Sequence, residues 1–219
     1  MMIRKRSVRG VTSVNSHLFG KATVQCLSPL VTLMIACLFL PFSQGLKERF
    51  EAYRRAYNQN DLKAVLSFLA PDYEFKVANS TYKVAKKDIS GLLEWDFATN
   101  AQSAYSDIEV KGDTISATLT EQNDFYKSIG ISERKYRFTY IYGEEGLIKE
   151  AMLEQALSDA VSFNAALKPA LGWARKERPQ ELSEIYPDGK FIYNTQMAKR
   201  WLTLLRDWRE AARINRRLC

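Results

Sequence analysis

The sequence predicts an α+β fold in which helices come first, antiparallel strands follow and a helical extension ends the chain. Two observations support this prediction. Apolar residues recur at helical spacing over residues 46–69, and four strand-like segments follow one another after residue 102. The chain is 46% apolar and 12% aromatic, which is enough to fill a core. Its length of 219 residues allows one domain and an extension.

One apolar stripe predicts each of the first two helices. The first stripe has spacings of four, three and four, and consists of Leu46, Phe50, Tyr53 and Tyr57. Asn60 and Asp61 then break the chain, because short polar side chains cap the free amides at a helix start. The second stripe ends before Pro71 and consists of Leu62, Val65, Leu66 and Leu69.

Two short strands, a third helix and four further strands complete the predicted domain. Residues 73–85 read as two strands that turn at Asn79-Ser80, and residues 86–100 read as a helix. We expect Trp95 on the flank of this helix to reach the interior, and Asp96 to be solvated. The four later strands are predicted over residues 103–112, 113–126, 134–142 and 147–155.

Alternation in segment 113–126 predicts which side chains face inward. Ile115, Ala117 and Leu119 alternate with serine and threonine, so the odd positions face the core. If the alternation continues, Glu121 and Asn123 also point inward. A carboxylate in an apolar cavity has a raised pKa and can act as an acid or a base. The other interpretation is that Glu121 pairs with a nearby cation or tyrosine hydroxyl and only shapes the pocket.

The strand at residues 134–142 has one charged face and one aromatic face. Lys135 and Arg137 on the charged face are predicted to pair with Glu150 and Glu154, which are therefore interpreted as structural. The aromatic face points inward and consists of Tyr136, Phe138 and Tyr140.

The formal charge of +7 does not indicate a nucleic-acid-binding protein. Residues 1–45 hold five basic residues and no acidic one, which leaves 27 basic against 25 acidic residues in the rest of the chain. The arginines near the C-terminus alternate with acids at helical spacing and are interpreted as a solvated helix face. We therefore predict no nucleic-acid partner.

Residues 1–45 have the layout of an N-terminal leader. A basic start precedes an apolar run from Leu27 to Phe42, and the small residues of Ser43-Gln44-Gly45 suit a signal peptidase. Three interpretations stay open: a cleaved export signal, an uncleaved membrane anchor, and a start codon placed too far upstream. The first predicts a periplasmic or secreted protein. The second predicts membrane contact only through residues 27–42.

Cysteine and histidine are confined to the two ends of the chain, at Cys26, Cys37, Cys219 and His17. Their absence from the body excludes Ser-His-Asp and Cys-His catalysis there, as well as histidine-ligated zinc and haem. We predict no cofactor and no metal. Acid–base chemistry is then left to Asp, Glu, Tyr, Lys and Arg.

Two segments resemble SnoaL-like members of the nuclear transport factor 2-like superfamily: FEAYRRAYNQNDLKAVLSFLAPDYEF and TEQNDFYKSIGISERKYRFTYIYGEEGLIKEAMLE. The resemblance covers about residues 46–155. It implies a cone, in which a curved antiparallel or mixed sheet wraps around three helices and encloses a pocket. The superfamily holds isomerases, cyclases, dehydratases and many non-enzymes. Tyr53 falls where ketosteroid isomerases have their oxyanion-hole tyrosine, but Val77 and Phe138 stand in place of the two aspartates.

Residues 156–219 are predicted to form the helical extension. A helix starts after a cap at Ser158 or Asp159, Pro169 restarts or kinks it, and Pro179 ends the next piece. The last helix carries an apolar stripe with two tryptophans, which we expect to pack on the cone. A partner interface or a membrane-surface contact is the alternative.

Two functions remain open at this point. The first is an exported pocket domain that binds a small, mostly apolar molecule, with isomerase-, cyclase- or dehydratase-type chemistry at Glu121 and Tyr53. The second is a non-catalytic domain for dimerisation or partner binding. A homodimer through the outer face of the sheet is predicted, and a cavity above about 300 Å³ would favour the first function. The predicted ligand-binding residues are Tyr57, Trp95, Asn123, Tyr136, Phe138 and Tyr140.

Overall fold

The structure is a computed structural model that describes residues 45–158 and 162–218. The predicted leader lies outside the described residues, apart from Gly45. Within the part of the chain that is described, no helix combines the length and the apolar character needed to cross a membrane.

The order of helices and strands confirms the predicted α+β class. A helix over residues 45–58 comes first. The remaining helices are α2 (Leu62–Ser67), α3 (Lys86–Ala98), α4 (Asp124–Ser128), α5 (Phe163–Glu177), α6 (Pro179–Ile185), the 3₁₀ turn η1 (Pro187–Gly189) and α7 (Thr195–Leu218). The strands are β1 (Leu69–Val77), β2 (Lys83–Ala85), β3 (Gln102–Lys111), β4 (Thr114–Gln122), β5 (Arg134–Tyr142) and β6 (Ile148–Ser158).

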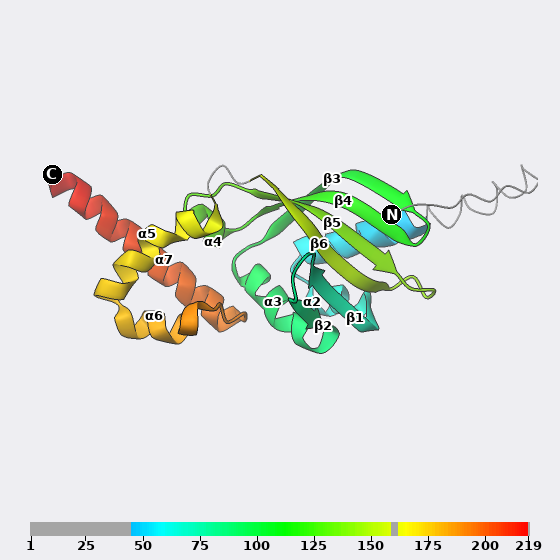
Figure 1. Cartoon of the computed structure of the whole chain (residues 1–219), viewed down its shortest axis with the longest axis horizontal. Helices are drawn as coiled ribbons and strands as arrows, with labels where there is room; N and C mark the ends of the chain where they lie inside the picture. Colours follow the sequence, from blue (N-terminus) through cyan, green and yellow to red (C-terminus); the bar gives the residue numbers. More distant parts are fainter. Residues whose placement is uncertain (1–44, 159–161, 219) are drawn as a thin grey trace, which may run out of the picture. The chain divides into compact units, whose positions relative to one another are not determined.

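The six strands form one mixed sheet in the order β2-β1-β6-β5-β4-β3 (Figure 1). The β1–β6 pair is parallel and the other pairs are antiparallel. Register shifts interrupt the β1–β6, β3–β4 and β5–β6 pairs. Because irregularities of this kind bend a strand and increase its twist, they account for the curvature of a sheet that encloses a pocket.

The break between the first two helices forms as predicted. Asn60 adopts a left-handed φ of 58°, which asparagine tolerates better than most residues. Asp61 then caps α2 by accepting a hydrogen bond from the amide of Ala64. The predicted second helix is too long, because α2 ends at Ser67 and Leu69 already belongs to β1. Pro71, which disfavours helix at the residue before it, lies in the irregular stretch of β1.

The alternation in β4 also forms as predicted, but the strand is shorter than expected. Ile115, Ala117 and Leu119 are buried. The strand ends at Gln122, and Asn123 is the N-cap of α4. The predicted continuation through residue 126 is therefore wrong, because an asparagine that caps a helix start competes with the ladder of the strand.

Lys135 and Arg137 do not pair with Glu150 and Glu154, so the predicted ion pairs are wrong. Three register shifts in the β5–β6 pair displace these side chains from one another. The partners within the described residues are Glu133 for Lys135, Glu109 for Arg137, Lys76 for Glu150 and the Thr139 hydroxyl for Glu154.

The described part of the extension contains three α-helices, the first of which begins later than predicted. α5 begins at Phe163 behind the cap residue Ser162, and not after Ser158, because β6 continues to that residue; Asp159 lies outside the described residues. Pro169 lies inside α5. Pro179 is the first residue of α6, where its missing N–H costs nothing.

The apolar stripe of α7 packs inward, as expected. Trp201 and Leu205 have no exposed surface and Leu204 has 1%. They share a cluster with Trp95 of α3 and Phe125 of α4. The extension is therefore joined to the cone through α3 and α4.

Candidate functional site

A cavity of about 350 Å³ opens between the sheet, the first three helices and parts of the extension. Aromatic and aliphatic side chains form most of its wall, and a few polar groups converge on it. Every predicted site residue lines this cavity: Glu121, Tyr53, Tyr57, Trp95, Asn123, Tyr136, Phe138 and Tyr140.

Asp96 also lines the cavity, so the expectation that it is solvated is wrong. The hydroxyl of Tyr57 donates a hydrogen bond of 2.9 Å to its Oδ2 atom. The cause is that α3 packs against β1 on one side and against α7 on another, so more of its surface is covered than one stripe would predict. A signal was present in the sequence, since Asp96 lies three residues after Leu93 and seven after Ile89, on the same helical face.

The side chain of Asn123, two residues later, holds the carboxyl group of Glu121 in place. Glu121 Oε1 accepts a hydrogen bond of 2.9 Å from Asn123 Nδ2. Asn123 Oδ1 accepts a second bond, of 2.7 Å, from the amide of Tyr126. Asn123 is 3% exposed, so one buried amide both begins α4 and orients the carboxyl group of Glu121.

The two carboxyl groups affect each other's protonation. Burial raises the pKa of Asp96 well above its usual value, the charge of Glu121 raises it further, and the Tyr57 bond opposes this. Burial also raises the pKa of Glu121, against the effect of the Asn123 bond and of Arg134. Because Glu121 has the cation beside it, we place the first proton of the pair on Asp96. Asp96 is therefore the more readily protonated member of the pair.

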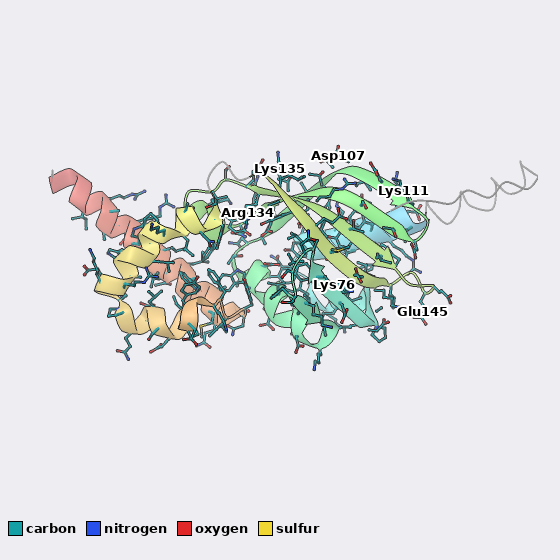
Figure 2. All side chains as sticks on the ribbon, viewed as in Figure 1. Lys76, Asp107, Lys111, Arg134, Lys135 and Glu145 are labelled. Carbon is teal, nitrogen blue, oxygen red and sulfur yellow. The ribbon has the colours of Figure 1, made fainter. Side chains whose placement is uncertain are left out.

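Arg134 supplies the positive charge of the site. It lies at the start of β5 (Figure 2), directly opposite Glu121 in the β4–β5 register. Its guanidinium carbon lies 5.0 Å from the ring centre of Tyr136, 5.6 Å from that of Tyr126 and 5.5 Å from that of Phe163. Cation–π contacts of this kind hold a guanidinium beside a pocket while it balances a carboxylate. Sequence reasoning missed Arg134 because its position depends on the strand register.

Tyrosines form the wall of the cavity nearest the sheet. The Tyr105 and Tyr140 hydroxyls are 2.7 Å apart, and burial raises the pKa of Tyr105 to about 12. The ring of Tyr53 lies 5.8 Å from that of Tyr140 and 6.1 Å from that of Phe68. Among the described residues, no hydrogen bond reaches the hydroxyl of Tyr53. A ligand in the cavity can therefore bind there.

Among the residues that the structure describes, no group of three or more His, Cys, Asp or Glu side chains is placed to hold a metal ion.

Solved structures with a similar fold include SnoaL-like and NTF2-like proteins, as the resemblance in the sequence predicted. SalBIII is an epoxide hydrolase/cyclase-like enzyme described with a role in pyran ring formation in the polyether salinomycin. It is 12% identical with a TM-score of 0.46, over 53% of this chain and 94% of SalBIII. A SnoaL-like protein of unknown function from Burkholderia thailandensis is 14% identical with a TM-score of 0.42, over 52% and 98% of the two chains. An NTF2-like protein of unknown function from Cytophaga hutchinsonii is 9% identical with a TM-score of 0.41, over 49% and 87%.

No protein-family model matches the sequence, and no curated protein matches it. Likeness at this level concerns the fold and not the reaction. The alignments with these solved structures leave about half of this chain uncovered.

Proposed function

We propose that this protein binds a small, mostly apolar, uncharged molecule in the cavity and transfers protons at its polar end through Glu121 and Asp96. The observation that carries the proposal is the pair of carboxyl groups in one aromatic cavity of about 350 Å³. This volume lies within the range of small-molecule sites.

The two carboxyl groups have different roles in this proposal. Glu121, ionised beside Arg134, accepts a proton from the substrate. Asp96, protonated, gives its proton to a substrate oxygen on which negative charge develops. A pair of this kind suits reactions in which one proton leaves the substrate and another is added, such as isomerisation, cyclisation or dehydration. The hydroxyl of Tyr53 binds the same end of the ligand.

The first experiment is native mass spectrometry of protein purified from its own host, which would reveal a co-purified molecule of the proposed kind. With a ligand in hand, Glu121→Gln should abolish turnover and leave the fold intact, because glutamine keeps the shape but cannot accept the proton. Tyr53→Phe should cost one hydrogen bond to the ligand, about 1–3 kcal/mol.

The matched control is Glu48→Gln, an exposed glutamate on the first helix, which should behave as the wild type. Full turnover in Glu121→Gln would exclude the base role. Loss of folding in that variant would instead assign Glu121 a structural role.

We also propose that residues 1–45 direct export and are absent from the mature protein or only tether it. The basic, then apolar, then small-residue order of the leader supports this. N-terminal sequencing of the mature protein should begin near Leu46. Finding the intact chain in the cytosol, beginning at Met1, would exclude export. A homodimer through the outer face of the sheet stays a prediction.

A further inference from the structure

One wall of the cavity comes from the extension and not from the cone. Phe191 and Tyr193 line the cavity together with Phe163 of α5. Phe191, Ile192 and Tyr193 form a short segment between η1 and α7, which we call the strap. The strap follows the last strand of the sheet, β6, by more than 30 residues, so this part of the wall comes from a segment outside the sheet and its first three helices.

The strap lies directly on α3. A Cβ atom added at Gly91 would lie 2.6 Å from the carbonyl oxygen of Tyr193. The ring of Trp95, one turn further along α3, lies 5.4 Å from that of Tyr193 and 5.8 Å from that of Phe191. Only glycine permits this close approach. The absence of a side chain at Gly91 therefore determines how closely the strap packs on α3.

The other side of the strap is fixed to the core of the extension. The ring of Phe191 lies 5.0 Å from that of Tyr186 and 5.2 Å from that of Trp201. Trp201 is fully buried. Packing on both sides holds Phe191 as a rigid part of the wall.

Tyr193 marks the place where the cavity meets solvent. It lines the cavity and yet is 40% exposed, as is Tyr82 at 44%. Burial raises the pKa of Tyr193 to about 12, and the nearby Tyr82 adds to this. Two neighbouring side chains that both line a cavity and face solvent lie at its opening.

We infer that Phe191 and Tyr193 are specificity-determining residues, which set the length of the ligand that the cavity accepts. The inference rests on the proposed binding function. Ile192 lies between them but is 37% exposed and does not line the cavity, which makes it a matched control within the strap.

The test uses the full chain, the uncharged fluorophore N-phenyl-1-naphthylamine, and its displacement by straight-chain alcohols of increasing length. In the wild type, affinity should rise with chain length and then level off where the alcohol meets the strap. In Tyr193→Ala the rise should continue past that length, by about fourfold for each further buried methylene. Ile192→Ala should keep the wild-type limit.

Phe191→Ala should extend the limit in the same way, and Phe191→Leu provides a milder change if the alanine variant does not fold. Gly91→Ala changes the position of the strap and no side chain of the wall, so it should also shift the limit. An unchanged limit in all of these variants would overturn the inference while the proposed function stands. Failure of the wild type to bind any probe would overturn both.

Discussion

Trp201→Ala is expected to lower the free energy of unfolding by about 3–5 kcal/mol, because it removes a fully buried indole and leaves a cavity. The indole lies 5.6 Å from the rings of both Phe125 and Tyr186. Its loss therefore weakens the contact between the extension and the cone as well as the extension itself. Urea unfolding followed by tryptophan fluorescence and circular dichroism measures the change.

Ile214→Ala is the matched control, since residue 214 lies on the same helix and is 59% exposed. Its effect should stay within about 0.5 kcal/mol. Within the described residues, the Trp201 Nε1 group is buried without a hydrogen-bond partner. Trp201→Phe should therefore keep most of the stability, since it removes no hydrogen bond. A cost for Trp201→Ala no larger than that of the control would contradict the packing described for α7.

Asp96→Asn is expected to change how stability depends on pH. The pKa of Asp96 is raised in the folded protein, so between its unfolded value, about 3.9, and its folded value the native state holds a proton that the unfolded chain has lost. Stability from this group is therefore fully present at acid pH and is lost as pH rises through the folded pKa. Asparagine does not titrate and keeps an oxygen that can accept the Tyr57 bond.

The measurement is the free energy of unfolding in urea at several values between pH 4 and pH 8. The wild type should lose stability relative to Asp96→Asn as the pH rises. Asp88→Asn, at the exposed start of the same helix α3, should follow the wild-type curve. Parallel curves for the wild type and Asp96→Asn would show that Asp96 is not the protonated member of the pair.

Local patterns predicted the elements that build the cone. The stripe Leu46, Phe50 and Tyr53 and the alternation of Ile115, Ala117 and Leu119 are buried as expected. Each pattern depends only on the period of its own element, so no knowledge of the neighbours is needed. The alternation of inward and outward side chains along a strand also correctly predicted that Glu121 and the aromatic face of β5 line the cavity.

Features that depend on contacts between distant segments were not predicted. Arg134 reaches the site only because β4 and β5 pair in one particular register. Asp96 faces the cavity, where Tyr57, 39 residues earlier in the chain, donates a hydrogen bond to it. The strap has no periodicity that would place Phe191 in a wall, and Gly91 gives no sign in the sequence that a backbone passes over it.

The double role of Asn123 links the charge of the site to the integrity of α4. Its two hydrogen bonds, one to Glu121 and one to the amide of Tyr126, depend on a helix of only five residues. Short helices open more easily than the global fold. Each such opening, detectable as exchange of the Tyr126 amide hydrogen, frees Asn123 from its place and leaves Glu121 without its donor. Since α7 packs on α4, we expect a substitution in α7 that loosens α4 to raise the pKa of Glu121, because the Asn123 bond lowers it.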